Sequence, residues 1–237
     1  YMFAEANTYP SSEKLYDWEL GYQYTAPRLS LGVNLYYMKY KDQLVPTGMV
    51  NDGSDALNTN VSDSYRRGVE LSASWRATGW FTVGANATFS QNRIENYVDA
   101  LKDSPTYGKE LGDMTIAYSP DVIANAFLNF HHRGFEAVFH TQHVGKQYFT
   151  NNENDALSLD AYCVTNLNLA YTFRTRSARS VRLGLLINNL FNAEYESNGY
   201  GYSYMDTWSG PAPVRIDEAY YFPQAPLNVL ANVTVKF

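Results

Sequence analysis

The chain has 237 residues, with 21 tyrosines, 12 phenylalanines and a formal net charge of −6. The negative charge argues against nucleic acid as a partner, because phosphate contacts need a basic patch, and the single cysteine, Cys163, excludes an internal disulfide. Abundant aromatic and β-branched residues favour strands. No run approaches the roughly 18 apolar residues of a transmembrane helix. A strand between lipid and water gives only a weak hydropathy signal, so the composition does not exclude a β-stranded membrane protein.

Apolar and polar residues alternate with period two along about nine segments, which is the pattern of half-buried strands. Most segments have ten residues or more, whereas globular strands have a mode of about five or six. A tilted strand needs about nine to eleven residues to cross a bilayer. The pattern therefore favours a membrane wall, with strands expected at 16–24, 29–41, 69–76, 80–90, 119–131, 134–146, 159–173, 181–190 and 227–237. Residues 1–6 are interpreted as the end of a tenth strand.

The connections between these segments alternate in length. Outer-membrane barrels have short periplasmic turns and longer extracellular loops. Assigning every short connection to the periplasm gives a consistent meander and places Phe237 there too. The short connections are 26–28, 78–79, 132–134 and 174–180, and the long ones are 43–63, 93–118, 147–158 and 191–226.

Aromatic residues gather near the expected periplasmic ends, always on the apolar side of their strand. A lipid-interface girdle predicts this sorting. The alternative is that they cap the core of a soluble β-sandwich, which gives no reason for the sorted loop lengths. The residues are Tyr24, Trp75, Phe81, Phe130, Phe135, Tyr171, Phe173 and Phe237.

The number of strands indicates a part of a larger barrel. Nine long strands in an open sheet leave two edges, and unpaired edges are untenable in lipid. Bacterial single-chain barrels close with an even number of strands. We therefore expect an all-β, antiparallel, up-and-down transmembrane β-barrel, here a fragment of about 9–10 strands whose N-terminal portion is missing.

Four short motifs carry a family resemblance. They are Trp18-Glu19-Leu20-Gly21-Tyr22, Arg67-Gly68-Val69-Glu70-Leu71, Asn189-Leu190-Phe191-Asn192 with Tyr195, and the terminal strand ending in Phe237. In order and spacing they resemble the C-terminal region of TonB-dependent receptors. Their sequences are similar to those of Bacteroidetes members. Phe237 is similar to the assembly signal that the outer-membrane insertion machinery reads.

The resemblance implies that residues 1–237 are the C-terminal portion of a 22-stranded barrel, without its first strands and N-terminal plug domain. The implied function is import of a scarce nutrient, most of all a ferric siderophore, across the outer membrane of a Gram-negative bacterium. Implied partners are outer-membrane lipid, the insertion machinery, a small nutrient ligand, and TonB through the missing N-terminal region. No cofactor is expected.

Two other functions are weighed against this one. A general porin would be a passive channel without a plug. A barrel-borne enzyme or adhesin is the second alternative. An enzyme needs a nucleophile or an activated water with a base in reach, and the sequence has no Gly-x-Ser-x-Gly and no compact Ser/His/Asp set.

The long connection 191–226 is the foremost candidate for ligand contact, because aromatic side chains give stiff contact area with a polar tip and long loops often carry function. The alternative, equally open, is that its aromatics pack the loop or line the upper lipid interface. The candidates are Tyr195, Tyr200, Tyr202, Tyr204, Trp208, Tyr220 and Tyr221, with Tyr97, Tyr107 and Tyr148 in the other loops.

The remaining polar residues have plainer interpretations. No metal site is expected, since the pairs His131/His132 and His140/His143 point to opposite faces of their strands. Cys163 is interpreted as an inert apolar filler. Charged residues on polar strand faces are expected to line the lumen, as a hydrated wall or as contacts to the missing plug: Asp17, Glu19, Glu70 and Arg76.

Overall fold

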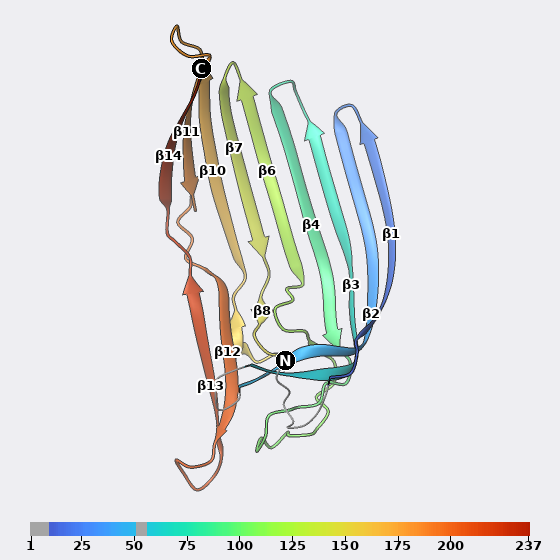
Figure 1. Cartoon of the computed structure of the whole chain (residues 1–237). Coiled ribbons are helices and arrows are strands. Elements are labelled where there is room, and N and C mark those ends of the chain that lie inside the picture. The colour runs from blue at the N-terminus through green and yellow to red at the C-terminus, as the bar shows by residue number, and fades with distance from the viewer. Residues whose placement is uncertain (1–9, 51–55) are drawn as a thin grey trace.

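The structure is a computed structural model and describes residues 10–50 and 56–237. Nine long antiparallel strands form one curved sheet in the order β1-β2-β3-β4-β6-β7-β10-β11-β14 (Figure 1). The wall strands are β1 Lys14–Ala26, β2 Leu29–Val50, β3 Ala56–Arg76, β4 Phe81–Ile94, β6 Val122–His132, β7 Phe135–Val144, β10 Tyr162–Phe173, β11 Ser180–Asn188 and β14 Asn228–Lys236. Their number and antiparallel order confirm the expected all-β wall.

Five short or projecting strands and one turn of helix belong to the long connections. They are β5 Met114–Thr115, β8 Gln147–Tyr148, β9 Ser158–Leu159, β12 Glu196–Asp206, β13 Val214–Pro223 and the 3-10 helix η1 Asp155–Leu157. Within the described residues, no helix is both long and apolar enough to cross a bilayer.

The registers put the apolar residues of neighbouring strands directly opposite one another on one side of the sheet. Leu35 lies opposite Leu20 on one side and Val69 on the other. Far along the sheet, Leu185 lies opposite Leu169 and Ala231. We call this side the apolar face and the other the polar face. Because cross-strand pairs share a side of the sheet, one continuous apolar face runs from β1 to β14.

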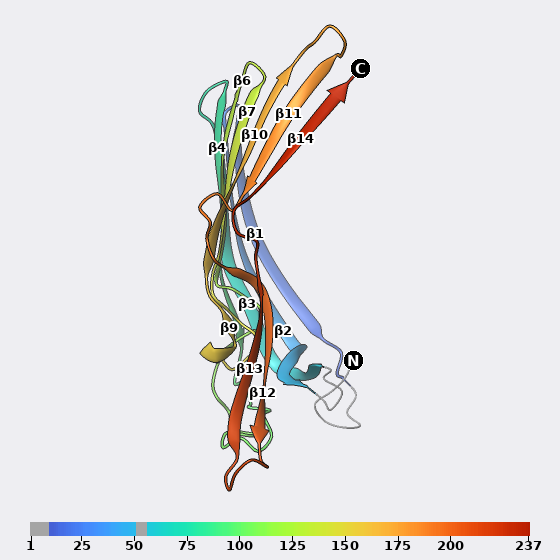
Figure 2. The ribbon, with the colours of Figure 1, turned by 90° about the vertical axis from the view of Figure 1, so that its left-hand side faces the viewer.

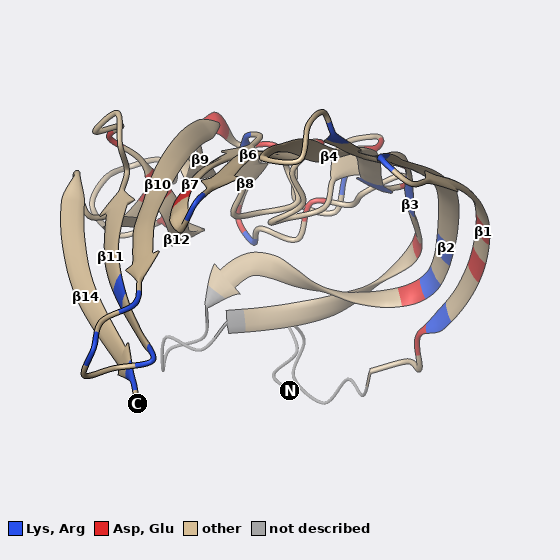
Figure 3. Cartoon of the chain, turned by 90° about the horizontal axis from the view of Figure 1, so that it is seen from above, with Lys and Arg blue, Asp and Glu red and all other residues tan. Residues whose placement is uncertain are grey.

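Large side chains of the apolar face are open to their surroundings. Leu20 is 71% exposed, Tyr22 69% and Val233 66%. In a soluble sandwich these side chains would form the buried core, so the exposure contradicts that alternative. The sheet curves strongly when seen from above (Figure 3), and the polar face has a hollow of about 310 Å³ lined by Glu19, Asn34, Arg66 and Glu70.

All four short connections lie at one end of the wall together with the C-terminus, as expected (Figure 1). One of them shows the turn chemistry directly. Arg133 and Gly134 are the only residues between β6 and β7, and both have positive φ, 46° and 87°. Positive φ at both central positions defines a type I′ turn, whose twist matches paired strands. A Cβ on Gly134 would lie 2.3 Å from the Thr172 carbonyl oxygen.

The long connection expected at 43–63 belongs for the most part to the two strands beside it. β2 continues to Val50 and β3 begins at Ala56, so the hairpin extends past the wall and folds over its concave side (Figures 2 and 3). Gln43 pairs with Val61 and Val45 with Thr59. The sequence pattern misses this extension because a hairpin beyond the bilayer needs no uniformly apolar side.

The connection 191–226 was also expected as a loop and instead contains the β12–β13 hairpin. The connection 93–118 holds β5 and an isolated bridge between Val98 and Glu110. Buried cores occur at this end of the molecule, one around Val45, Ile94, Tyr97 and Ile116, the other around Phe149, Leu157 and Leu159. The long connections are thus folded structures that hold their side chains in place.

Candidate ligand-binding site

The β12–β13 hairpin gathers most of the aromatic residues singled out in the sequence on one side. Tyr200 lies opposite Tyr220, Tyr202 opposite Glu218 and Tyr204 opposite Ile216. The rings of Tyr200 and Tyr220 stack with their centroids 4.9 Å apart. The rings of Tyr204 and Trp208 are nearly parallel, with an interplanar angle of 6° and centroids 6.5 Å apart. We call the side formed by Tyr200, Tyr202, Tyr204, Trp208, Glu218 and Tyr220 the aromatic face.

The Glu218 carboxylate organises this face by accepting hydrogen bonds from three phenols. Tyr202 and Tyr220 donate to Oε2 over 2.7 and 2.8 Å, and Tyr204 donates to Oε1 over 3.1 Å. The bond from Tyr202 is the main reason that the pKa of Glu218 is lowered, and the same bond raises the pKa of Tyr202. Near neutral pH the face is therefore anionic at Glu218 and has its phenols held in fixed directions.

The opposite side of the hairpin packs on the connection between β7 and β10. A Cβ on Gly199 would lie 2.7 Å from Phe149 Cζ, and one on Gly201 would lie 2.9 Å from Leu157 Cδ2. The two glycines thus allow close packing that a larger side chain would prevent. The Tyr221 ring lies on this side, 5.8 Å from the Phe149 ring. This packing fixes the hairpin and leaves the aromatic face open.

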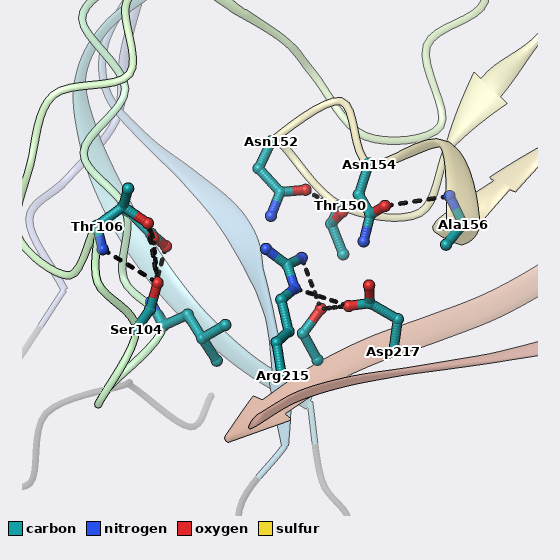
Figure 4. A network of polar contacts seen from close by, with 11 residues as sticks. Ser104, Thr106, Thr150, Asn152, Asn154, Ala156, Arg215 and Asp217 are labelled. Atoms are coloured by element: carbon teal, nitrogen blue, oxygen red, sulfur yellow. Dashed lines mark hydrogen bonds and ion pairs between the residues drawn. The ribbon is translucent and has the colours of Figure 1, made fainter. Parts of the chain in front are cut away.

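A polar network near the hairpin adds to its rigidity (Figure 4). The Arg215 guanidinium donates to Asp217 over 2.9 Å and to Ser203 over 3.0 Å, and Ser203 donates to Asp217 over 2.6 Å. Burial alone would raise the pKa of the Asp217 carboxyl. The hydrogen bonds that it accepts from Ser203 and Arg215 have the larger combined effect, so its pKa is lowered. Asn154 accepts from the Ala156 amide over 3.1 Å and caps η1.

The connection between β4 and β6 bounds a hollow of about 550 Å³ beside the extended β2–β3 hairpin. Tyr107 lines it and is 49% exposed. Tyr97 is only 4% exposed, and burial raises its pKa to about 12. Its side chain belongs to the loop core with Val45 and Ile94. Tyr107 is thus accessible here, and Tyr97 has a packing role.

The remaining sequence candidates lie apart from the aromatic face. The Tyr195 ring stacks on Tyr162 with centroids 4.7 Å apart, at the base of the hairpin. The ring centroid of Tyr148 lies 5.0 Å from Lys146 Nζ. The structure therefore brings together Tyr200, Tyr202, Tyr204, Trp208 and Tyr220, and separates Tyr97, Tyr107, Tyr148, Tyr195 and Tyr221 from them.

The Asn-Leu-Phe-Asn motif has a structural role that the sequence did not reveal. Asn189 is 3% exposed, has a φ of 51°, and its side chain donates to the Ala193 and Ala225 carbonyls over 2.8 and 3.3 Å. Asn192 accepts from the Leu227 amide over 2.8 Å. The two asparagines join the end of β11 to both legs of the hairpin, which positions the aromatic face.

The polar face carries the charged residues expected there. The Asn34 amide donates to Glu19 over 3.3 Å and to Glu70 over 3.2 Å. Asp17 lies opposite Met38, and Arg76 opposite Thr82. The histidine pairs point to opposite faces of their strands, as the sequence predicted. Across residues 10–50 and 56–237, no group of three or more His, Cys, Asp or Glu side chains is arranged for metal binding.

The antiparallel wall, its exposed apolar face and its sorted connections define the class of protein: this is the barrel wall of an outer-membrane protein. The sequence profile described as "TonB dependent receptor-like, beta-barrel" matches residues 2–190. The chain belongs to the TonB-dependent receptors. The family places it in the outer membrane of Gram-negative bacteria, and it is a family of transport receptors, not of enzymes.

Among curated proteins, the chain is similar to the pesticin receptor of Yersinia enterocolitica, with 24% identity over 190 residues, 80% of this chain and 26% of that protein. Its fold is similar to the ferric yersiniabactin uptake receptor FyuA of Yersinia pestis, with TM-score 0.66, 20% identity, and coverage of 95% of this chain and 30% of FyuA. The ferric-catecholate import receptor Fiu of Escherichia coli gives TM-score 0.64, 17% identity, and coverage of 98% and 30%. The chain thus spans about a quarter to a third of these proteins.

Proposed function

We propose that the whole protein is a transporter that captures a ferric siderophore at the long-connection end of the barrel and imports it with energy from TonB. The observation that carries the proposal is the aromatic face of the β12–β13 hairpin. Stacked rings of Tyr200, Tyr220, Tyr204 and Trp208 offer rigid contact area. The names of FyuA and Fiu tie those proteins to ferric chelates, which supports the same substrate class here.

Packing on the opposite side of the hairpin supports a binding role. Ligand affinity rises when contact groups are ordered before the ligand arrives. The hairpin meets this condition, since Gly199 and Gly201 lie against Phe149 and Leu157 and Glu218 fixes three phenols. The stacked rings are therefore prepared to contact planar aromatic groups of such a chelate.

The test is uptake of radio-iron chelates by cells that carry the full-length receptor and make no siderophore of their own. Tyr200→Ala with Tyr220→Ala removes the central stack, and Tyr22→Ala is the matched control on the apolar face, 69% exposed. We expect uptake of the best chelate to fall at least about tenfold, the loss of roughly 1.4 kcal/mol of binding, only in the double variant. Equal uptake at equal surface abundance would remove the aromatic face from the site.

The same assay separates a receptor from a passive porin. A TonB-coupled receptor should lose uptake when TonB is deleted, while a porin should not. Uptake that persists without TonB would contradict the transport proposal whatever the ligand is.

A further inference from the structure

The long connections are strongly acidic. Together, the stretches 43–63, 93–118, 147–158 and 191–226 hold 15 of the 24 Asp and Glu residues of the chain and only 4 of its 18 Lys and Arg residues. The rest of the chain has more basic than acidic residues, although the whole chain carries a net charge of −6. A surface with one sign of charge concentrates ligands of the opposite sign. The end of the wall that carries the aromatic face therefore favours a cationic ligand.

The aromatic face holds two of these carboxylates among its rings. Glu218 accepts hydrogen bonds from three phenols there. Asp206 lies two residues beyond Tyr204 on β12 and so belongs to the same side. Its carboxylate accepts from the Trp208 and Ser209 amides over 3.0 and 3.1 Å. Amide donors stabilise the charged form of a carboxyl group, so the face carries negative charge at both positions.

The single basic residue of the β12–β13 hairpin lies on the other side. Arg215 is the only Lys or Arg in this hairpin, all of which the structure describes. Its guanidinium donates to Asp217 over 2.9 Å and to Ser203 over 3.0 Å, and these two residues lie opposite each other on the packed side. No cation of the hairpin neutralises Glu218 or Asp206. An anionic ligand would therefore meet like charge on the aromatic face.

The hydrogen-bond donors of the aromatic face are already in use. Tyr202, Tyr204 and Tyr220 each donate their hydroxyl hydrogen to Glu218. A phenol oxygen can still accept a hydrogen bond after it has donated, and a carboxylate can only accept. The face thus offers acceptors and ring faces to a ligand. Both match an ammonium group, which has N–H donors and a positive charge.

We propose that the aromatic face selects a cationic chelate, whose free ammonium group lies against Glu218 and the rings of Tyr202 and Tyr220. The selection rests on the proposed transport function and adds the charge of its substrate. It disfavours a ferric tris-catecholate, because three doubly deprotonated catechols around one ferric ion leave three negative charges. It favours a chelate whose iron-binding groups leave a neutral core and whose periphery carries an amine.

The test measures uptake of ferric chelates by cells that carry the full-length receptor and make no siderophore of their own. The probes are ferrioxamine B and its N-acetyl and N-succinyl derivatives. They share one ferric trihydroxamate core and differ only at the terminal amine, so their net charges are positive, zero and negative. A ferric tris-catecholate extends the series to an anionic chelate with aromatic rings.

The test variant combines Glu218→Gln with Asp206→Asn, which removes two charges from the aromatic face and keeps hydrogen-bonding groups in place. The matched control combines Glu110→Gln with Asp103→Asn, at exposed positions between β4 and β6. Both variants reduce the acidity of the long connections equally, so a difference between them reports the face itself. Val214→Lys adds a cation to the face at a position opposite Asp206 that is 57% exposed.

We expect the wild type to take up ferrioxamine B about fivefold faster than its acetylated form, as a cation–π contact beside a carboxylate predicts, and the two anionic chelates most slowly. The test variant should lose this order, and the control should keep it. Val214→Lys should move the preference toward the succinylated form, and it decides if the test variant does not reach the surface. Equal uptake of the three hydroxamates, preference for an anionic chelate, or an unchanged order in the test variant or in Val214→Lys would overturn the selection.

Failure of the transport proposal would give a different result. Uptake of none of these chelates, or uptake that persists without TonB, contradicts transport and the charge selection together. TonB-dependent uptake that is indifferent to charge contradicts the selection alone and leaves the transport proposal in place.

Discussion

Arg182 on β11 reaches across β10 and donates two hydrogen bonds to Glu136 on β7, at 2.9 and 2.7 Å. Ala170 lies opposite Glu136 and Gly184, and these small residues leave room for the crossing. The pair lies on the polar face, while Phe135, Ala137 and Leu183 on the same strands belong to the apolar face.

This pair should contribute little to stability, because both side chains are more than a third exposed, 38% and 43%. We expect a double-mutant cycle with Arg182→Gln and Glu136→Gln to give a coupling energy of about 0.5–1 kcal/mol, since exposed pairs are screened by water and the bidentate geometry favours the upper end. Denaturant unfolding of the refolded barrel measures it. A coupling of several kcal/mol would show that this part of the lumen is dry.

Asn189→Ala should have a much larger effect. The buried amide joins β11 to the hairpin base, and its removal leaves the Ala193 amide and carbonyl without their partner. We expect a loss of about 2–3 kcal/mol in the free energy of unfolding. Asn198→Ala, at an exposed position, serves as the control. Equal, small losses in both variants would contradict the bracing role of the motif.

Removing the hairpin tip should separate assembly from ligand capture. Asp206 pairs with Val214, so an Asn-Gly turn in place of residues 207–213 should close the hairpin with type I′ geometry. This deletes Trp208 and leaves the packing on Phe149 in place. We expect normal heat-modifiable barrel assembly and reduced iron uptake. Unchanged uptake would exclude the tip from the site.

Titration of the aromatic face provides a pH test. The pKa of Glu218 is lowered from 4.5 by its phenol donors, so its stabilisation of the hairpin is present above pH 4.5 and is lost as the pH falls through the folded value. The pKa of Tyr202 is raised from 10.0, so its contribution is present below pH 10.0 and is lost as the pH rises through the folded value.

Glu218→Gln should therefore lower the pKa of Tyr202 toward 10.0, because the main cause of its shift is the bond to the carboxylate. The tyrosinate absorbance of each protein, minus that of the matching Tyr202→Phe variant, isolates this residue. An unchanged Tyr202 titration in Glu218→Gln would mean that the carboxylate does not organise the phenols.

Much of the wall could be predicted from the sequence, because lipid imposes a simple rule on each strand. Leu183, Val233 and Phe81 had to be apolar, so period two identified the strands and their facing. Outside the bilayer this rule no longer applies. The β2–β3 extension was missed, because pairs such as Gln43 and Val61 join a polar and an apolar residue and give no apolar side.

The candidate site was predicted as a set of aromatic residues without their arrangement. Sequence placed Tyr97 and Tyr202 in the same category, yet Tyr97 is buried in a loop core and Tyr202 is bonded to Glu218. Glu218 itself was missed. The signal that could have found it is the alternation Tyr200, Tyr202, Tyr204 opposite Glu218 and Tyr220, which already follows a strand period.

The most direct test of the two-faced wall compares arginine at two adjacent positions of β4. Ala85 lies opposite Ala73 and Ala126, while Asn86 lies opposite Asn125 and accepts its amide over 3.2 Å. In lipid vesicles, Ala85→Arg should lower the free energy of unfolding by about 2–4 kcal/mol and Asn86→Arg by much less, because only the first buries a charge in hydrocarbon. Equal losses at the two positions would contradict the assignment of the apolar face to lipid.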